Sequence, residues 1–517
     1  MALSDFLAKV DKVIKRDDIR GVYGENIDAD FAYALGLALA ENLLDNTAVD
    51  PVNVVVGHDM RVSGPVLARS LCTGLDDGGC RSIMVGLAGT ELVGFLAAKY
   101  SDVIDGGVII TASHNPKDNN GFKFFGRAGM PLPLAARIEP PMPEDPLKRL
   151  ALSIKKRRIP TRLAWKDFAP DYVETAIERA GVDFAVASAG GGEPLRVAVE
   201  AGNGMGGWIW HEVARMAAEL EWTFSNDTPD GSFPVVIPNP LQADYQKMVA
   251  DLVLRTGSDV GICFDGDADR VAVADEKGRM LSPPLLTVSV GKRLRQKLGP
   301  SARMAFNLAS SWIVPDTFGD RENVLGGSGA LMTPVGYSKI KPIMYESPEI
   351  AFGAEHSGHY MFRDFWGADS GMTAGLLMLE WVAELHAQGQ TLSGALEGSR
   401  ARYYESGEIN FQLPPDRPGD DVIAEATKRF GGEIRRLYVV VEDRCRIVDS
   451  YPPQGLELSV SDVRAECDGW WFCMRKSGTE AAAGDLLRLF VEADRDRELM
   501  ERKRDALAQL VGPGLRV

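Results

Sequence analysis

The sequence predicts an α/β protein of several domains, on the basis of its length, its short apolar runs and the amphipathic segments between them. The chain has 517 residues. At roughly 100–200 residues per domain, this length predicts about three to five domains. Apolar runs rich in valine, isoleucine and alanine, with little polar alternation, are typical of strands buried on both faces of a sheet. Strands of this kind that alternate with helices indicate parallel or mixed sheets.

Five apolar runs end abruptly in small or polar residues, and we predict a strand for each. They are Val52–Gly57, Gly107–Ala112, Leu195–Ala201, Asp259–Phe264 and Ala302–Leu308. The amphipathic stretches that we predict as helices are Phe31–Leu44, Pro65–Leu75, His211–Leu220 and Gly375–Leu385. In sheets of this kind ligands bind beyond the carboxyl ends of the strands. The residues just after each run are therefore the candidates for function.

Three changes in composition predict the domain boundaries. Residues 131–160 are rich in proline and contain the basic run Lys155–Arg158, which is typical of a linker. The segment Ser282–Pro284 breaks helices and strands, and a third boundary is expected near Glu397–Tyr404. The domains expected from these boundaries are 1–160, 161–282, 283–399 and 400–517.

Charge and composition exclude several classes of protein. The chain has 57 Lys and Arg against 73 Asp and Glu, a net charge of −16, which argues against nucleic acids or anionic membranes as partners. Met1–Asp18 contains no apolar signal-peptide core, and no apolar run approaches the ~18 residues of a membrane helix. The six cysteines form no CxxC pair and no zinc spacing. We expect a cytoplasmic protein with no obligate protein partner.

Ser113 follows the second predicted strand, at the head of a Ser-His-Asn-Pro segment. A hydroxyl at the carboxyl end of a buried strand, with backbone amides nearby, suits a phosphoryl group. Serine, asparagine and proline are also common in ordinary turns, so a plain turn is the alternative. From an extended or turning backbone, the neighbours Thr111 and His114 are expected to point away from the Ser113 hydroxyl.

Three aspartates at alternate positions, Asp265, Asp267 and Asp269, follow the fourth predicted strand. Carboxylates brought this close favour a shared hard cation, and oxygen-only ligands suit Mg²⁺ or Ca²⁺. An EF-hand Ca²⁺ loop is the sharpest alternative, but its sixth position needs glycine and here holds Arg270. Its flanks should also be helices, whereas Val271–Ala274 is expected to be a strand. We therefore predict a Mg²⁺ site.

The segment from Gly353 to His359 gathers a carboxylate, a hydroxyl and two imidazoles among small residues. Glu355 and Ser357 supply acceptors and donors that could bracket sugar hydroxyls, on backbone that can approach a ligand closely. A zinc site is an alternative for His356 and His359, but the sequence offers no further ligands at metal spacing. A polar turn without any ligand is the second alternative.

Residues 475–480 combine a guanidinium, two hydroxyls and a glycine turn. Arg475, Ser477, Gly478 and Thr479 could form a nest of donors for a phosphate group. An exposed basic turn is the alternative. Because the whole chain is acidic, such local cations must outweigh the long-range charge of the protein at an anionic substrate.

Residues 202–207 formally satisfy the GxGxxG pattern of dinucleotide-binding folds, and Asp227 lies at a suitable distance downstream. A dinucleotide-dependent oxidoreductase is therefore an alternative at this point. The pattern alone is weak, and it leaves Ser113 and the three aspartates unexplained. A Ca²⁺-binding module without catalysis, based on Asp265–Glu276, is another alternative.

Taken together and in this order, these segments resemble the α-D-phosphohexomutase family, and within it the bacterial phosphomannomutase/phosphoglucomutase branch. The resemblance extends over nearly the whole chain. It rests on the segments Asp18–Val22, Val56–Pro65, Thr111–Pro116, Asn120–Lys123, Gly202–Gly204, Asp265–Arg270, Glu355–His359 and Arg475–Glu480. The resemblance implies four domains around a central cleft: three related α/β domains with mixed sheets and a C-terminal α+β domain of the TBP-like kind.

The resemblance also implies roles for individual residues. Ser113 would be carried as a phosphoserine. The groups implied as ligands of one Mg²⁺ per chain are Asp265, Asp267, Asp269 and the Ser113 phosphate. The positions implied for sugar recognition are Glu355, Ser357 and Tyr337. Those implied for the distal phosphate are Arg475, Ser477, Gly478 and Thr479. Those implied around the reaction centre are Arg20, Lys123, Arg270 and His359.

The activity that the resemblance implies is phosphoryl transfer between the 1 and 6 positions of hexose phosphates, mannose first and glucose next. The cycle would pass through a phosphoserine enzyme and a hexose 1,6-bisphosphate, which would also act as an activator. The protein would then be an intramolecular phosphotransferase of carbohydrate metabolism, with sugar phosphates as its partners. Phosphoglucosamine mutase is the nearest alternative within the family.

The sequence departs from the family pattern at four places. His58 stands where arginine is usual, and Thr90-Glu91 replaces the usual Thr-Pro pair. Tyr337 occupies a position that is often histidine. After Glu480 the expected proline and nearby arginine are missing, and the next arginine is Arg488. These differences bear on the choice among sugars and on the geometry of the C-terminal domain.

Overall fold

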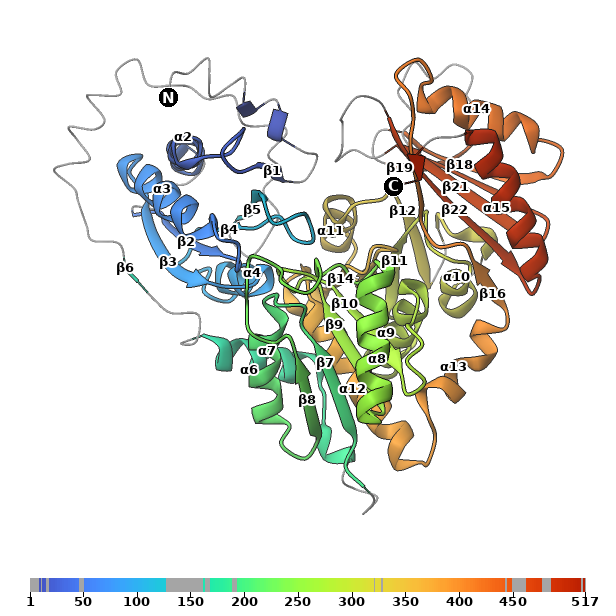
Figure 1. Ribbon diagram of the computed structural model, residues 1–517, viewed down its shortest axis with the longest axis horizontal. Coiled ribbons are helices and arrows are strands. Elements are labelled where there is room, and N and C mark those ends of the chain that lie inside the picture. Colours follow the sequence, from blue (N-terminus) through green and yellow to red (C-terminus); the bar gives the residue numbers. More distant parts are fainter. Residues whose placement is uncertain are drawn as a thin grey trace. The chain divides into compact units, whose positions relative to one another are not determined.

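The computed structural model describes most of the chain. The described residues are 9–10, 12–14, 18–45, 51–126, 161–162, 168–187, 193–319, 321–326, 329–441, 444–448, 462–476, 485–512 and 515–516. The chain divides into two compact units. The first contains Met1–Ser282 and Ser357–Ser393, and the second contains Pro283–His356 and Gly394–Val517. Figure 1 labels most of the helices and strands of both units.

The first sheet has six strands in the order β1-β5-β4-β2-β3-β6. Its strands are β1 (Ile19–Val22), β2 (Asn53–His58), β3 (Arg81–Leu87), β4 (Gly106–Ile110), β5 (Asn119–Gly126) and β6 (Thr161–Arg162). β2 runs parallel to β3 and β4, whereas β5 runs antiparallel to both β4 and β1. The sheet is therefore mixed, and the turn that carries Ser113 leaves it at the carboxyl end of β4.

Helices cover both faces of this sheet, which explains the continuous apolar character of its strands. α2 (Ala29–Asp45) and α3 (Gly64–Asp77) share one core with Val54 and Val56 of β2, and α4 (Thr90–Lys99) packs against β2, β4 and β5. The two helices α2 and α3 approach so closely that a Cβ on Gly36 would lie 2.4 Å from the Leu71 carbonyl oxygen. This crossing therefore requires glycine.

The second sheet has the order β10-β9-β7-β8 and carries the aspartate loop. Its strands are β7 (Arg196–Glu200), β8 (Glu221–Ser225), β9 (Val260–Phe264) and β10 (Val271–Asp275). β7 is parallel to β8 and β9, and β10 turns back antiparallel to β9. The helices of this region are α6 (Ala169–Ala180), α7 (Gly206–Met216), α8 (Ala243–Thr256) and α12 (Gly371–Ala387). Both α8 and α12 contact β9 and β10.

The second unit begins with a parallel arrangement of three strands. β11 (Arg303–Asn307) lies between β12 (Ala330–Thr333) and β13 (Ile350–Ala354). The helices that contact these strands are α9 (Pro283–Leu298), α10 (Ile313–Phe318) and α11 (Tyr337–Glu346). In the first unit, the short strands β14 (Tyr360–Phe362) and β15 (Ala368–Asp369) pair antiparallel. Helix α13 (Leu392–Arg400) precedes the C-terminal domain.

The C-terminal domain is an antiparallel sheet with two helices packed on it. Its strands are β16 (Tyr403–Glu405), β17 (Ile409–Gln412), β18 (Ile434–Val441), β19 (Arg444–Val448), β20 (Asp462–Cys467), β21 (Trp470–Lys476), β22 (Leu486–Asp494) and β23 (Leu515–Arg516). Their order is β19-β18-β20-β21-β22-β17-β23, and β16 also pairs with β22. α14 (Gly419–Arg429) and α15 (Arg497–Val511) bury their apolar residues in one core with Val439, Phe472 and Leu489 of the sheet.

The predicted fold class is confirmed: three α/β domains with mixed sheets are followed by a sheet-rich C-terminal domain. The five predicted strands are present as β2, β4, β7, β9 and β11. The helix predicted over His211–Leu220 is wrong in its limits, because α7 runs from Gly206 to Met216. The helix begins at Gly206, where a Cβ would lie 2.5 Å from the Phe264 ring, so this position requires glycine.

Other expectations concern composition and the division into domains. All six cysteines are free thiols. Among the described residues, no helix combines the length and the apolar character that crossing a membrane requires. The predicted boundaries after residues 160, 282 and 399, and the central cleft, stay predictions. The proline-rich segment 131–160 lies outside the described residues.

Candidate active site

Ser113 lies in the turn after β4, with a backbone φ of 52°. This left-handed conformation is uncommon for residues other than glycine. The buried hydroxyl of Ser113 donates to Asp265 Oδ2 at 2.6 Å and accepts from Arg270 Nη2 at 2.7 Å. The structure therefore brings the turn after β4 together with the loop between β9 and β10.

Arg61 holds this turn in place through hydrogen bonds of its guanidinium. Its guanidinium is fully buried and donates through Nε to Asp59 Oδ2 at 3.2 Å. The two terminal nitrogens donate to four backbone carbonyls at 2.6–2.9 Å. Those carbonyls belong to Ser113, Asn115, Pro116 and Asn119. One side chain thus joins four backbone carbonyls of the turn and fixes its shape.

The two neighbours of Ser113 behave differently. The Thr111 hydroxyl donates to Asp59 Oδ2 at 2.7 Å and accepts from the Ser113 backbone N–H at 2.9 Å, and no hydrogen bond joins it to the Ser113 hydroxyl. His114 does not point away: its Nδ1 lies 3.1 Å from Ser113 Oγ and contacts Arg270. The expectation for His114 is wrong because the positive φ of Ser113 turns the chain back on itself. Burial, and then the charge of Arg270, holds the pKa of His114 well below its ordinary value.

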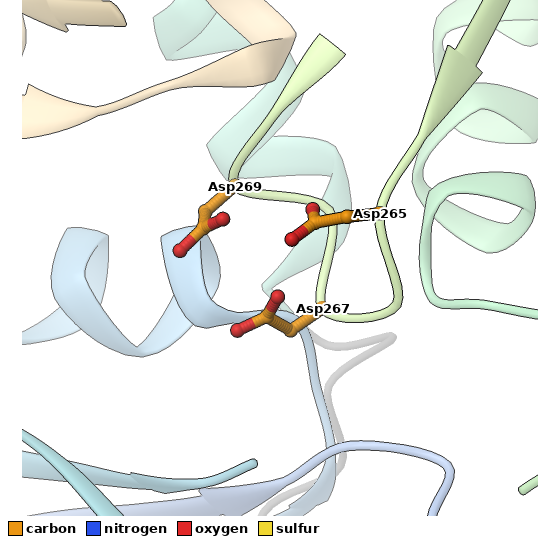
Figure 2. A group of neighbouring side chains, drawn as sticks. All are labelled: Asp265, Asp267 and Asp269. Atoms are coloured by element: carbon orange, nitrogen blue, oxygen red, sulfur yellow. The ribbon is translucent and has the colours of Figure 1, made fainter. Parts of the chain in front are cut away.

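Figure 2 shows the carboxylates of Asp265, Asp267 and Asp269 turned toward a common space. All three residues are buried, and each offers an oxygen within 4.8 Å of the others. Oδ1 of Asp267 and Oδ1 of Asp269 are buried without a hydrogen-bond partner. Unsatisfied buried oxygens are costly, and a compact set of carboxylate oxygens suits Mg²⁺. These residues fit the expected ion, and the strands on both sides of the loop exclude an EF-hand.

Two cations already neutralise part of this charge. Lys123, on β5, donates to Asp267 Oδ2 at 2.7 Å and to Asp269 Oδ2 at 2.6 Å. Arg270 donates through Nε to Asp265 Oδ2 at 2.9 Å. Burial would raise the pKa of Asp267, but the ammonium of Lys123 outweighs it and holds that pKa well below its usual range. Burial raises the pKa of Asp265, against the opposing charge of Arg270.

His359 reaches the same loop from a different part of the sequence. Its Nε2 lies 3.7 Å from Asp269 Oδ1, and its Nδ1 lies 3.0 Å from Ser357 Oγ. A backbone bridge between Arg270 and His359 holds the two chain segments together. Ser357 and His359 are thus connected to the aspartate loop.

Arg20, on β1, lies beside the serine turn. It donates through Nε to Asp18 Oδ2 at 2.7 Å and through Nη1 to Asn115 Oδ1 at 3.3 Å. The first unit thus brings together eight residues that were expected at the metal site and the reaction centre. They are Arg20, Ser113, Lys123, Asp265, Asp267, Asp269, Arg270 and His359.

Three residues that sequence reasoning did not single out for chemistry also contact this centre. Asp59 and Arg61 hold the serine turn, and Thr90 donates to Asp267 Oδ2 at 2.5 Å. Asp59 and Arg61 follow the carboxyl end of β2, and Thr90 follows that of β3. The criterion that singled out Ser113 could therefore have found Asp59 and Arg61, but not Thr90, because β3 was not among the predicted strands.

Glu355 and Tyr337 belong to the second unit. Glu355 is buried and accepts from the Gly336 N–H at 2.7 Å and from Asn307 Nδ2 at 3.4 Å. Tyr337 follows Gly336 at the first position of α11, and its ring centre lies 4.9 Å from Lys341 Nζ. Glu355 is therefore held at the start of the helix that carries Tyr337, while their approach to Ser113 stays a prediction.

The zinc alternative at the same segment gains no support. His356 contacts Asn307 through Nδ1 and Glu408 through Nε2, at 2.9 Å and 3.3 Å. Both of its ring nitrogens therefore already have polar partners. Within the described ranges, the three aspartates are the only group of such side chains close enough to share an ion.

Arg475, on β21, lies directly opposite Arg488 on β22. Arg475 Nε is buried without a hydrogen-bond partner, while Arg488 Nη1 donates to Glu408 Oε1 at 3.1 Å. Burial, and then the charge of Arg488, lowers the pKa of Arg475. Like charges opposite one another are unfavourable unless an anion joins them. Residues 477–484, with Ser477, Gly478 and Thr479 of the expected phosphate loop, lie outside the described part of the chain.

The glycine-rich segment after β7 is packed against protein. A Cβ on Gly207 would lie 2.3 Å from the Asp227 carbonyl oxygen, and one on Gly204 would lie 2.9 Å from that of Gly266. Asp227 itself pairs with His211 Nε2 at 2.6 Å. These glycines allow the loops to approach closely, so packing of protein against protein accounts for the glycines without a dinucleotide.

Known proteins resemble this chain over most of its length. Three family models match it, described as phosphoglucomutase/phosphomannomutase α/β/α domains I, II and III, over residues 11–142, 170–278 and 285–403. The phosphomannomutase of Salmonella montevideo is 30% identical over 512 residues, which cover 96% of this chain and 98% of that protein. The phosphohexose mutases of Xanthomonas campestris strain B100 are 30% identical over 503 residues, with coverages of 96% and 98%.

Two solved structures share the fold. A phosphoglucomutase/phosphomannomutase family protein from Burkholderia thailandensis has a TM-score of 0.70 at 23% identity, covering 97% of this chain and 98% of its own. The phosphoglucomutase pp63/parafusin from Paramecium, in an open form, has a TM-score of 0.71 at 18% identity, covering 97% and 93%. At these identities the likeness concerns the fold alone.

Proposed function

The chain belongs to the phosphoglucomutase/phosphomannomutase family, and on this premise we propose that it interconverts hexose 1-phosphates and hexose 6-phosphates. As a member of this family it is a mutase. Mannose phosphates are the first substrates that we propose, because relatives 30% identical over nearly the full length bear the name phosphomannomutase. Glucose phosphates come next. The observation that carries the proposal is the Ser113 hydroxyl, buried between Asp265 and Arg270 beside the acidic loop.

In the proposed cycle, Ser113 carries a phosphoryl group on Oγ. A sugar hydroxyl attacks the phosphorus, the bond to Ser113 Oγ breaks, and a hexose 1,6-bisphosphate forms. The bisphosphate reorients and returns its other phosphoryl group to Oγ, so the phosphoserine is regenerated and the isomeric monophosphate leaves. Added hexose 1,6-bisphosphate would act as an activator because it phosphorylates any Ser113 that has lost its phosphate.

The proton of the attacking hydroxyl needs an acceptor, and we assign His359 this role. Lys123 is less suited, because Asp267 and Asp269 outweigh the effect of its burial and hold its pKa well above the ordinary value. A lysine that stays protonated stabilises negative charge instead. Arg270 already donates to Ser113 Oγ, and Arg20 lies beside the turn, so both are placed to stabilise the phosphoryl oxygens.

The groups proposed to hold one Mg²⁺ are Asp265, Asp267, Asp269 and the Ser113 phosphate. Bound there, the ion would neutralise charge between the phosphoryl group and the acceptor oxygen. The chain's own part is to keep the carboxylates ionised and aimed at one point. Lys123 does this for Asp267 and Asp269 through its two hydrogen bonds.

For substrate recognition we propose two subsites. The residues proposed to bind sugar hydroxyls are Glu355, Ser357 and Tyr337. The residues proposed to bind the distal phosphate are Arg475, Ser477, Gly478 and Thr479. Glu355→Gln should then change the discrimination between mannose and glucose phosphates, or lower turnover of both. A variant with the parent's kcat and KM for both sugars would remove Glu355 from this role.

A coupled assay with mannose, glucose and glucosamine 1-phosphates, each at several concentrations with Mg²⁺ and a trace of glucose 1,6-bisphosphate, tests the proposal. We expect the highest kcat/KM for mannose, then glucose, and a rate that falls when the bisphosphate is omitted. A clear preference for glucosamine 1-phosphate would replace the proposed substrate. Turnover of none of the three would reject the function.

A further inference from the structure

We propose that Glu91 is a positioning residue for the metal-binding loop. Its buried side chain ties the amino termini of α4 and α12 together, and these two helix ends hold the Asp265–Arg270 loop between them. The inference rests on the proposed function, since it takes this loop as the Mg²⁺ site. Glu91 also stands where the family resemblance leads one to expect proline.

The amino terminus of α4 contacts one side of the Asp265–Arg270 loop and hydrogen-bonds to it. Thr90, the first residue of the helix, donates its N–H to the Asp267 carbonyl at 3.0 Å and its hydroxyl to Asp267 Oδ2 at 2.5 Å. A Cβ on the preceding Gly89 would lie 2.9 Å from the same carbonyl oxygen. The start of α4 thus fixes both the backbone and the carboxylate of Asp267, with the positive end of the helix dipole toward the acidic loop.

The amino terminus of α12 grips the other side. A Cβ on Gly371 would lie 2.9 Å from the Arg270 carbonyl carbon and 3.2 Å from the Ala268 carbonyl oxygen. Ser370 caps this helix by accepting from the Thr373 N–H at 2.9 Å. The aspartate loop therefore packs directly on the first turn of α12.

Glu91 joins these two helix ends. Its Oε1 accepts from the Met372 N–H at 3.1 Å, and its Oε2 accepts from the Ser370 hydroxyl at 2.9 Å. The Met372 N–H belongs to the first turn of α12, whose donors have no partner within the helix. The carboxyl group of α4 thus supplies a cap for α12, and a proline at this position would offer no such acceptor.

A third contact attaches the tie to α6. The Tyr172 hydroxyl hydrogen-bonds Glu91 Oε2, and its ring packs edge-on against Phe95 and Phe365, with ring centres 5.3 Å and 5.9 Å away. Glu91 is only 2% exposed, and burial raises its pKa to about 8. At neutral pH the side chain is therefore mostly a neutral acid, rather than a counter-charge for the site. In this form Oε2 carries the proton and donates to the Ser370 or Tyr172 hydroxyl oxygen, while Oε1 still accepts from the Met372 N–H.

Loss of this tie should loosen the loop and weaken metal binding. Lys123 holds one oxygen of Asp267 and one of Asp269, and the other oxygen of each has no hydrogen-bond partner. The direction of these free oxygens therefore also depends on the position of the loop backbone, which the two helix ends fix. Groups behind metal ligands typically affect affinity by about 10–100-fold. The sugar sites we propose lie on other segments, so the effect should appear in Mg²⁺ affinity before it appears in the KM for sugar phosphate.

Isothermal titration of the full-length protein with Mg²⁺ alone, well below the unfolding temperature, tests the inference. We expect Glu91→Ala to raise the Kd about 10-fold or more, and Glu91→Gln to stay within about 3-fold of the parent because the amide keeps shape and hydrogen bonds. Leu92→Ala is the matched control. This residue is the buried neighbour of Glu91 on the same helix, so its truncation lowers stability without cutting the tie.

A second variant covers the case in which Glu91→Ala fails to fold. Tyr172→Phe removes one hydrogen bond and keeps the ring, and we expect a Kd about 2- to 3-fold above the parent. The inference is overturned if Glu91→Ala, or Tyr172→Phe where Glu91→Ala does not fold, binds Mg²⁺ with the Kd of the parent. It is also overturned if Leu92→Ala raises the Kd as much as Glu91→Ala does, or if Glu91→Gln raises it as much as Glu91→Ala does. A parent protein that binds no Mg²⁺ would instead overturn the proposed metal site, and this inference with it.

Discussion

The two charged regions of the molecule differ in the kind of atom that they leave unsatisfied. In the acidic loop, Lys123 and Arg270 already pair with the carboxylates, and the atoms without a hydrogen-bond partner are oxygens of Asp267 and Asp269. In the C-terminal domain the corresponding atom is a donor, Nε of Arg475. The first region is thus prepared for a cation and the second for an anion.

This difference indicates that the buried polar atoms left without hydrogen-bond partners, rather than the net charge of the chain, decide which ion a site binds. The whole chain carries a charge of −16, yet Arg475 and Arg488 lie opposite one another on adjacent strands. A buried polar atom without a partner costs about 1–3 kcal/mol, and a ligand that satisfies it recovers this cost. The sign of that atom therefore predicts the sign of the ligand.

The largest effect is expected from Ser113→Ala, which leaves both charged regions in place and removes the atom that receives the phosphoryl group. Turnover should fall by about 10⁴-fold or more, because covalent transfer through this oxygen is the proposed reaction. The melting temperature should change little, since the substitution empties no core volume. The coupled assay and phosphopeptide mass spectrometry before and after bisphosphate treatment measure both properties.

Ser82→Ala is the matched control for that experiment. Ser82 is another buried serine of the same sheet, hydrogen-bonded to Asp76, and its substitution should leave turnover at the parent level. A fully active Ser113→Ala protein, or a phosphate found on another residue during turnover, would refute the phosphoserine mechanism.

The next largest effect is expected from a change in the acidic loop, the region prepared for a cation. Asp267→Asn removes one ligand charge and one of the unsatisfied oxygens, so turnover should fall by about 10²–10³-fold and require more Mg²⁺. Chelator should abolish the parent's activity, and added Mg²⁺ should restore it. Asp251→Asn, at an exposed aspartate paired with Lys247, is the control. Full activity of the parent in excess chelator would end the assignment.

A smaller effect is expected from a change in the C-terminal domain, in the region prepared for an anion. Arg475→Ala should raise the KM for sugar phosphates about 10- to 100-fold and lower kcat less, because a contact to the non-reacting phosphate contributes in every bound state. Steady-state kinetics on both sugars measure the two constants. Arg435→Ala, at an exposed arginine of the same domain paired with Asp468, should match the parent. Unchanged kinetics in Arg475→Ala would mean that the phosphate binds elsewhere.

The smallest effect that we expect concerns the charge of Glu91, the residue that we propose positions the acidic loop. The pKa of Glu91 is raised from 4.5 in the unfolded chain to about 8 in the folded one, so its stabilising contribution is full below pH 4.5 and lost as pH rises through 8. Glu91→Gln does not titrate. The stability of the parent relative to this variant should therefore fall between pH 5 and pH 8, by on the order of a few kcal/mol.

Calorimetric unfolding of both proteins at matched pH values measures that difference, with every other titrating group common to the two. A difference that stays constant from pH 5 to pH 8 would show that Glu91 ionises normally. A difference that grows with pH would mean that the carboxylate, rather than the acid, is the stabilising form.

The local elements could be read from the sequence because their determinants lie within a few residues of one another. The apolar run before Ser113 forms β4, and the run before Asp265 forms β9. Alternation of aspartates within a tight turn between paired strands is also local, so the shared space of Asp265, Asp267 and Asp269 could be predicted. The limits of α7 could not, because the helix begins within the glycine-rich segment at Gly206, and the close packing of this glycine on Phe264 of β9 is a tertiary contact.

By itself, the sequence determined where strands end and which reactive side chains stand at those ends, since periodicity and turn chemistry act over one or two turns of chain. Only the tertiary structure decided which of these ends meet. The Glu91 carboxyl and the Ser370 hydroxyl are 279 residues apart in sequence, and Arg61 and the Ser113 carbonyl are 52 apart. Such partners are chosen by the need to satisfy buried polar groups once the apolar faces have packed, and no local pattern records that choice.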